Sequence, residues 1–237
     1  MADEELINRW DSYLGKLKER FFEILKQAEE PLNEVIENLQ FDNVIIINIK
    51  TALQHQTVEQ LFEKAEQGWD KMQVEIYKTG RLNLIKEQSI KLELIRDWMN
   101  EEFMKFEVDL FARAARKILD NVKKHVDEKK IHRCTQCAAE LPINIYSFMA
   151  FNIKCESCGS VNTYQPDDRI RALEYYVIEP LAEEYALEPK LKRDKDKNAQ
   201  REYFKMYYTY LMDNVPEKKE GYQRSLDERL NNPFFNM

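Results

Sequence analysis

The chain has 237 residues and a net charge of −7, with 43% hydrophobic and 33% charged residues. This length is enough for one or two domains with a sizeable core. Gly (5) and Pro (7) are scarce, which disfavours collagen-like, low-complexity and Gly-rich β architectures and favours long helices. We therefore expect a mainly α protein.

Two features of the sequence bear on its location. No apolar run approaches the roughly 18 residues of a membrane span. The chain begins Met-Ala-Asp-Glu-Glu, which is acidic where a secretory signal would be basic and then apolar. We expect a cytoplasmic protein that does not contact a membrane.

Charge is unevenly distributed along the chain. Residues 1–122 carry 17 basic and 24 acidic side chains, whereas residues 123–237 carry 19 of each. Affinity for a nucleic-acid backbone comes from Lys and Arg that neutralise phosphates. An acidic N-terminal half is poorly suited to that task, and only the C-terminal half is a candidate for it.

Two apolar stripes predict helices in the first 80 residues. The first stripe begins at Leu6 and reaches Leu39 in steps of three and four. Pro31 falls inside it and predicts a kink or a restart, because Pro disrupts a helix interior. The β-branched run at 44–49 permits a short buried strand, but a second helical stripe continues to residue 76, and we favour a helix over 43–77.

A third stripe predicts one more long helix in the N-terminal region. Gly80 favours a break, because Gly commonly follows a helix C-terminus. The apolar stripe then extends from Leu84 to Val122, so a helix over 82–130 is expected. With its neighbours it would form an elongated helical bundle or coiled-coil hairpin, a domain over residues 1–130, whose stripes are chiefly core packing.

Further helices are expected after the cysteine region. Asp167 or Asp168 can cap a helix that carries apolar residues from Ile170 to Tyr185, and Pro180 would bend or divide it. The charged stretch 189–198 predicts a loop or a mobile connector. An aromatic-rich helix follows from Tyr203 to Leu211, and we expect C-terminal helices over 167–237.

The most specific motif is a set of four cysteines. Cys134 and Cys137 form one Cys-x-x-Cys pair, and Cys155 and Cys158 form a second after 17 intervening residues. This spacing is typical of a zinc site with four cysteine ligands. Four thiolates leave no open position on the metal, so the predicted Zn²⁺ is structural.

The residues around the two pairs favour short strands. Residues 143–153 and 161–164 are rich in β-branched and aromatic side chains, which gives the order turn, strand, turn, strand. On the four cysteines and Gly159, the segment 131–166 resembles the zinc ribbons, a four-cysteine family that also includes rubredoxin-like folds. Ala138 stands where the first turn of that family usually has Gly. The resemblance implies a fold and a metal and leaves the function open.

Other interpretations of the cysteines are an iron site of the rubredoxin type and a disulfide or thiol-exchange pair. A redox Cys-x-x-Cys normally accompanies a βαβ pattern, which is absent, and disulfides are unusual in a reducing cytosol. His132 lies two residues before Cys134 and could support a sulfur or replace a ligand, although a surface role is the simpler expectation. His55 is expected to be a solvated or interhelical polar residue.

Catalytic motifs are not found. The sequence contains no Ser/His/Asp order, His-Glu-x-x-His, Gly-rich phosphate loop or Glu-x-x-His pattern. We therefore predict a non-catalytic interaction or scaffold protein, whose long helices serve self-association or bind a protein partner. An enzyme would need an unrecognised pocket between helices.

A nucleic-acid-binding zinc ribbon is the alternative function. It would combine phosphate contacts with base stacking, whereas the simpler expectation is that the aromatic residues pack the ribbon and the charges are solvated. The tyrosines of the last helix are likewise expected to be core or a docking surface. The candidate residues for nucleic acid are Lys129, Lys130, Arg133, Lys154, Arg169 and Arg171, with Tyr146, Phe148, Phe151 and Tyr164.

Overall fold

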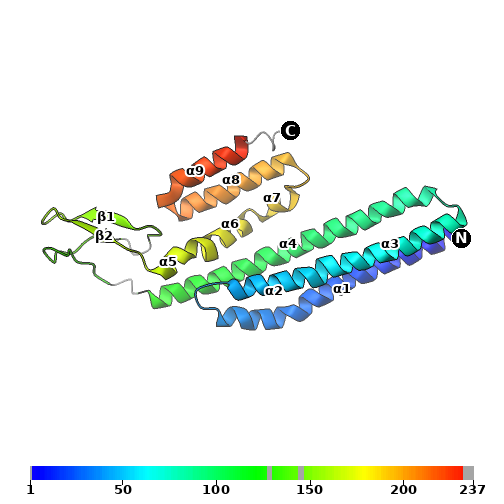
Figure 1. The fold of residues 1–237 in the computed structure, drawn as a ribbon, viewed down its shortest axis with the longest axis horizontal. Helices are drawn as coiled ribbons and strands as arrows, with labels where there is room; N and C mark the ends of the chain where they lie inside the picture. The colour runs from blue at the N-terminus through cyan, green and yellow to red at the C-terminus, as the bar shows by residue number, and fades with distance from the viewer. Residues whose placement is uncertain (1, 127–129, 144–146, 232–237) are drawn as a thin grey trace. The chain divides into compact units, whose positions relative to one another are not determined.

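The computed structural model describes residues 2–126, 130–143 and 147–231 and confirms a mainly α protein with a small β element (Figure 1). Within these residues, the only sheet has two strands. None of the helices among them combines the length and the hydropathy needed to cross a bilayer.

The chain divides into two compact units, and long helices run through both. Unit 1 comprises Met1–Val35 and Val44–Glu107, and unit 2 comprises Ile36–Asn43 and Val108–Met237. The predicted metal ligands all belong to unit 2.

Unit 1 is built from the three helical stretches that the apolar stripes predict. The first is α1 (Ala2–Asn38). The second consists of α2 (Val44–Gln54), the π-helical turn η1 (His55–Glu59) and α3 (Gln60–Thr79), so the helix over 43–77 is confirmed and the alternative strand at 44–49 is wrong. The third is the first part of α4 (Asn83–His125).

The core of unit 1 comes from one face of each helix. Phe21 of α1 is fully buried and its ring lies 5.2 Å from that of Trp98 on α4. Trp10 of α1 packs on Trp69 of α3 with ring centroids 5.8 Å apart. These contacts bury the predicted stripes, since apolar area removed from water stabilises the fold.

Pro31 does not act as the sequence led us to expect. Helix α1 continues through it without ending or restarting. Pro31 is exposed, so water can satisfy the carbonyl that loses its intrahelical donor. Leu32, which follows it, is 1% exposed, and burial of this kind offsets the cost of the proline.

The expected break at Gly80 is confirmed. Gly80 has φ 71°, a left-handed conformation that Gly adopts without steric cost. Its N–H donates to the carbonyls of Ile76 and Tyr77 and so ends α3. Helix α4 begins at Asn83 and ends at His125, five residues before the predicted end.

Unit 2 begins where α1 ends. The side-chain amide of Asn121 on α4 donates to the carbonyls of Leu39 at 2.6 Å and Gln40 at 3.0 Å. These bonds satisfy the carbonyls of the two residues that directly follow α1. The ring of Phe41 then meets His125 edge-on at 5.4 Å and has the Arg169 guanidinium over its face at 5.4 Å.

The cysteine segment contains the sheet. Strands β1 (Phe151–Lys154) and β2 (Val161–Tyr164) are antiparallel, with Phe151 opposite Tyr164 and Lys154 opposite Val161. A single bridge joins Arg133 to Glu140. The first strand is thus shorter than expected, because β1 covers only residues 151–153 of the run 143–153 and ends one residue beyond it. Residues 144–146 of that run lie outside the described part of the chain.

A helical segment follows the sheet. It consists of α5 (Asp168–Leu173), the π-helical turn η2 (Glu174–Ile178) and α6 (Glu179–Tyr185). Asp167 caps α5 by accepting from the N–H of Arg169. Pro180 does not divide the segment, because it falls in the first turn of α6, directly after the π-helical turn, where the ordinary hydrogen-bond pattern is already interrupted.

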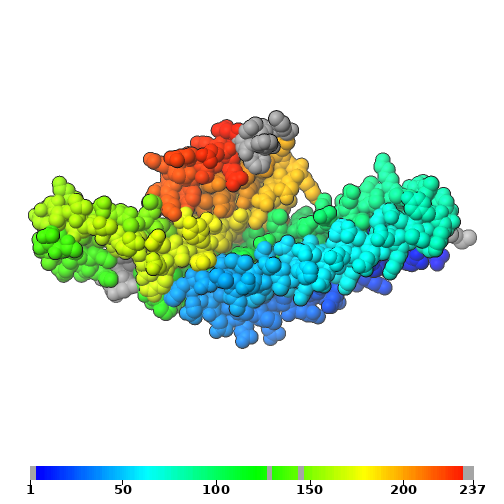
Figure 2. Space-filling model, viewed as in Figure 1, coloured from blue at the N-terminus to red at the C-terminus, as the bar shows by residue number. Residues whose placement is uncertain are grey.

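The last helices correct one prediction. The stretch 189–198 is non-helical only at residues 193–196, because α7 (Leu187–Lys192) occupies its first part and α8 (Lys197–Asn214) begins near its end. Lys190 of α7 pairs with Glu183 at 3.0 Å, a contact that composition does not reveal. The helical turn η3 (Pro216–Lys218) leads to α9 (Lys219–Asn231), and α8 and α9 lie against each other in Figure 2.

Candidate metal centre

The two Cys-x-x-Cys turns have the same backbone hydrogen bonds. In the first, the N–H of Ala138 donates to the carbonyl of Cys134 at 3.0 Å, and the N–H of Cys134 donates to the carbonyl of Ala139 at 2.8 Å. In the second, the N–H of Gly159 donates to the carbonyl of Cys155 at 2.9 Å, and the N–H of Cys155 donates to the carbonyl of Ser160 at 2.8 Å. Each turn therefore presents its two sulfurs in the same way.

The four predicted ligands come together. All four Sγ atoms lie within 4.8 Å of one another, and two distances across the turns, Cys134 to Cys158 and Cys137 to Cys155, are 3.7 Å. A disulfide needs about 2.05 Å between sulfurs, so the cysteines are free thiols. This cluster could coordinate a metal ion.

Sulfur protonation in the cluster is uneven. The Ser160 hydroxyl, 3.1 Å from Sγ of Cys134, lowers the pKa of that thiol to about 5, and it also lowers the pKa of Cys158. A backbone hydrogen bond from Ala139 lowers the pKa of Cys137, but the hydrogen bond with Cys158 and desolvation raise it to about 12. Neighbouring thiolates repel one another, and a cation shared by the sulfurs removes this conflict.

Three polar side chains around the sulfurs were not predicted. The buried amide of Asn162 on β2 accepts from the N–H and the hydroxyl of Thr135, at 2.9 and 3.1 Å, and its nitrogen lies 3.5 Å from Sγ of Cys134. Ser160 contacts both Cys134 and Cys158. A polar Asn at an inward position of a strand is the signal that could have identified Asn162 beforehand.

A small apolar cluster supports the turns. Cys134 and Cys155 are buried together with Leu141, and the partly buried Ile143 and Ile153 pack against them. Cys137 and Cys158 remain exposed. So few apolar residues make a minimal core, and segments of this kind usually depend on a metal or a disulfide for their fold.

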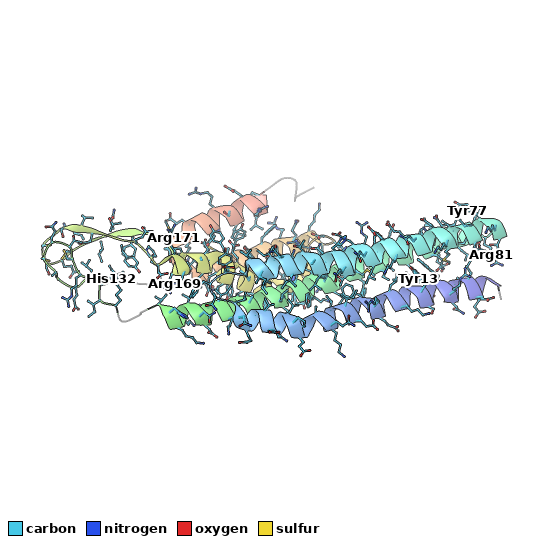
Figure 3. The ribbon with its side chains drawn as sticks, turned by 60° about the horizontal axis from the view of Figure 1, so that its bottom comes forward. Tyr13, Tyr77, Arg81, His132, Arg169 and Arg171 are labelled. Atoms are coloured by element: carbon cyan, nitrogen blue, oxygen red, sulfur yellow. The ribbon has the colours of Figure 1, made fainter. Side chains whose placement is uncertain are left out.

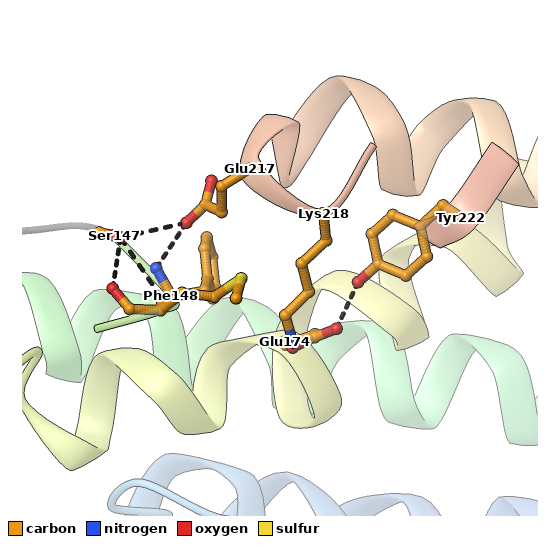
Figure 4. A network of polar contacts seen from close by, with 7 residues as sticks. Ser147, Phe148, Glu174, Glu217, Lys218 and Tyr222 are labelled. Atoms are coloured by element: carbon orange, nitrogen blue, oxygen red, sulfur yellow. Dashed lines mark hydrogen bonds and ion pairs between the residues drawn. The ribbon is translucent and has the colours of Figure 1, made fainter. Parts of the chain in front are cut away.

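The cysteine segment 131–166 is also attached to the C-terminal helices (Figure 4). The carboxylate of Glu217 on η3 accepts from the N–H of Phe148 at 2.6 Å. The next residue, Lys218, donates to the buried carboxylate of Glu174, which also accepts from the hydroxyl of Tyr222. Glu217 and Lys218 are neighbours on η3. Glu217 therefore binds the segment before β1, and Lys218 binds the helical segment after β2.

Neither histidine singled out by sequence joins the sulfur cluster. His132 is half-buried and meets the ring of Tyr164 edge-on at 5.0 Å. His55 is exposed and pairs with Glu59 at 2.6 Å, as a solvated residue would.

The residues predicted to bind nucleic acid do not form one exposed surface among the described residues. Among the aromatics, Tyr164 is buried and packs on Phe151 at 5.4 Å, and Phe148 is half-buried. These rings pack the ribbon, so they do not form an exposed platform for bases. The three arginines are in ion pairs: Arg133 with Glu140, Arg169 with Asp167 and Arg171 with Asp168. Lys154 is exposed on β1. Two further candidates, Lys129 and Tyr146, lie outside the described residues.

Comparison of the chain with protein-family models, with curated proteins and with solved structures finds no match.

Proposed function

We propose that the chain is a non-catalytic scaffold protein in which the four cysteines hold a structural zinc ion. The observation that carries the zinc assignment is the spacing of the sulfurs. A tetrahedron with zinc–sulfur bonds of about 2.3 Å has edges of about 3.8 Å, and the two cross-turn distances of 3.7 Å match such edges. A set of four thiol ligands leaves no position for substrate or water, which supports a structural role.

The surroundings of the sulfurs fit a metal with this shell. The N–H of Gln136 lies 3.4 Å from Sγ of Cys134, and Asn162 approaches the same sulfur. Donors of this kind stabilise thiolate ligands and orient them. The pairing of two similar turns with a two-stranded sheet is compatible with a zinc ribbon.

Metal analysis of the purified chain tests the zinc assignment. We expect about one zinc per chain, and loss of that zinc in Cys137→Ser, which removes an exposed ligand and leaves the buried pair intact. Ser147→Ala changes a hydroxyl outside the sulfur cluster and is the matched control, which should retain the metal. Iron with strong visible absorption, or a fold that keeps its ribbon in a chelator, would contradict the proposal.

The association role rests on unit 1. Its long helices present large apolar side chains to solvent, including Ile90 and Leu94, one turn apart on α4, with exposed fractions of 46% and 60%. Such side chains favour contact with a second helix when they lie on one face. A protein partner or a second copy of the chain would bury them.

Sedimentation of the zinc-loaded chain tests the association. We expect a defined oligomer, or a stable complex with a partner protein, that is lost in the double variant Ile90→Glu/Leu94→Glu. The control Glu87→Gln/Glu93→Gln changes charge on the same helix and should leave the association intact. A chain that remains monomeric and captures no partner through this face would contradict the scaffold role while leaving the zinc assignment unaffected.

A further inference from the structure

Unit 2 contains a cavity with an unusual lining. It has a volume of about 300 Å³ and lies where the end of α4, the beginning of the ribbon and the start of α5 meet. Two cationic side chains, Lys130 and Arg169, and two imidazoles, His125 and His132, line it from these three segments. Figure 3 shows two of them, His132 from the ribbon and Arg169 from α5, near each other.

The charge of this cavity contrasts with that of the chain. Among the described residues that line the cavity, Lys130 and Arg169 are cations and Asp167 is the only acid, so the net charge of these residues is +1 with neutral imidazoles. The whole chain carries −7. A concave site with a local positive charge attracts anions even on an acidic protein.

The charge of Asp167 is already neutralised. Both carboxylate oxygens of Asp167 accept from the Arg169 guanidinium, at 2.9 Å from Nε and 2.7 Å from Nη2. This ion pair, together with the N-cap bond to the Arg169 N–H at 2.9 Å, keeps Asp167 in place. The pair with Asp167 uses Nε and Nη2, so the other N–H groups of Arg169 remain, with Lys130 and the two imidazoles, as the groups that a ligand would meet.

The imidazole of His125 is oriented by the protein. Its Nδ1 lies 2.7 Å from the carbonyl of Asn121 and therefore donates its proton to that carbonyl, so that Nε2 can donate to an anion only when the ring is doubly protonated. Its ring stands perpendicular to that of Phe41, which also contacts the Arg169 guanidinium. Phe41 thus holds two cavity side chains in fixed positions, and a site with positioned donors loses less entropy when it binds.

The geometry points to a binding site for a phosphoryl group, formed by His125, Lys130, His132 and Arg169. A phosphate offers up to two negative charges and three acceptor oxygens, which suits donors that approach from three segments better than a planar carboxylate does. A volume of about 300 Å³ is at the lower end for ligand pockets, so the group is compact. The absence of an exposed aromatic platform among the described ribbon residues favours a small phosphorylated molecule over a nucleic-acid backbone.

Pyrophosphate is the probe for this site. Calorimetric titration of the zinc-loaded chain, at constant ionic strength set with chloride, should show saturable binding. Lys130→Met and His125→Gln should each raise the dissociation constant about tenfold, the effect of losing one charge-assisted hydrogen bond. The matched control Lys205→Met removes an exposed cation of α8 outside the cavity and should leave the constant unchanged.

Competition with a single-stranded oligonucleotide distinguishes the two sources of phosphate. An oligonucleotide without a terminal phosphate that fails to displace pyrophosphate supports a small phosphorylated ligand. If the oligonucleotide displaces pyrophosphate, and Lys130→Met weakens binding of the oligonucleotide, the phosphoryl site is retained. Its natural ligand is then a nucleic-acid backbone. The site is rejected if pyrophosphate does not bind saturably, or if Lys205→Met weakens binding as much as Lys130→Met does. Zinc content and circular dichroism of each variant separate this failure from loss of the metal centre or of the fold.

Discussion

The ring of Tyr13 on α1 occupies the space that a side chain at Gly68 on α3 would need. A Cβ atom at residue 68 would lie 2.4 Å from Cε1 of Tyr13, closer than any normal contact. The Tyr13 hydroxyl donates to the carbonyl of Lys64 at 2.7 Å and so fixes the ring against α3. Because Gly68 has no side chain, the Tyr13 ring on α1 can pack directly against α3.

Substitution of Gly68 tests this fit. Gly68→Ala should lower the free energy of unfolding by about 1–3 kcal/mol, because the ring must move and lose its hydrogen bond. Gly15→Ala on α1 is the control, since a methyl group at residue 15 would meet no atom within 4 Å, and it should raise stability by about 0.5–1 kcal/mol. Urea unfolding measures both, and equal effects of the two substitutions would contradict the fit.

Exchanging Ala and Gly should have opposite effects on stability in the two Cys-x-x-Cys turns. Ala138 has φ 63° and Gly159 has φ 73°, and a left-handed conformation costs a non-Gly residue about 1–2 kcal/mol. Ala138→Gly should therefore stabilise the zinc-loaded ribbon by about 1 kcal/mol. Gly159→Ala should destabilise it by a similar amount through the backbone conformation alone, because the added methyl meets only Cε of Lys154 at 3.8 Å. Hydrogen exchange of the ribbon amides measures both, and a loss of protection in Ala138→Gly would contradict the argument.

The buried carboxylate of Glu174 is expected to stabilise the C-terminal helices. Its side chain is 8% exposed and accepts from Lys218 and Tyr222. Glu174→Ala should cost about 2–3 kcal/mol, because it leaves Lys218 without a partner, and Tyr222→Phe should cost about 1 kcal/mol. Glu188→Ala breaks an exposed pair with Lys192 and should have almost no effect. Thermal unfolding compares the three, and a similar loss in Glu188→Ala would contradict the prediction.

Asp167 should make stability depend on acidity. The side-chain hydrogen bond from Arg169 lowers the pKa of this carboxyl from 3.8 to about 2. Because the folded pKa is the lower one, the contribution is complete above about pH 4 and is lost as the pH falls toward 2. A third of each side chain is exposed, so solvent screening keeps the effect below about 1 kcal/mol.

The variant Asp167→Asn isolates this contribution, because Asn still caps α5. The difference in unfolding temperature between the natural chain and the variant should be present at pH 6 and disappear by pH 2. Loss of metal in acid affects both proteins and cancels in the difference. A difference that stays constant over this range would show that the ion pair with Arg169 does not contribute.

Local patterns in the sequence were sufficient to predict the long helices and the four cysteines that come together. The apolar stripes from Leu6 and Leu84, the break at Gly80 and the Cys-x-x-Cys spacing depend on residues close together in the chain. Helix α7 was missed because its stability depends partly on Lys190 pairing with Glu183, which composition does not show. Continuity through Pro31 was missed because it depends on burial of the next residue against other helices.

The sites were harder to predict than the elements that carry them. Asn162 reaches Cys134 only after β1 and β2 pair, and the cavity joins His125 to Arg169 across 44 positions of sequence. Lys130 and Arg169 were already candidates for phosphate contacts, but their position beside two imidazoles follows from the fold alone.

The π-helical turn η1 has a consequence for how this bundle tolerates changes in length. A π-helical turn accommodates one residue more than the α-helix around it, so α2 and α3 keep their buried faces, with Ile46 and Leu61 both in the core. Deletion of the exposed Gln56 would convert η1 to a regular helix and leave the faces of α2 and α3 in register. An insertion or deletion elsewhere in α3 would instead rotate one face by about 100° and turn its apolar side chains toward water. Residues 55–59 are therefore the place in this helix where a homologous chain can differ in length by one residue.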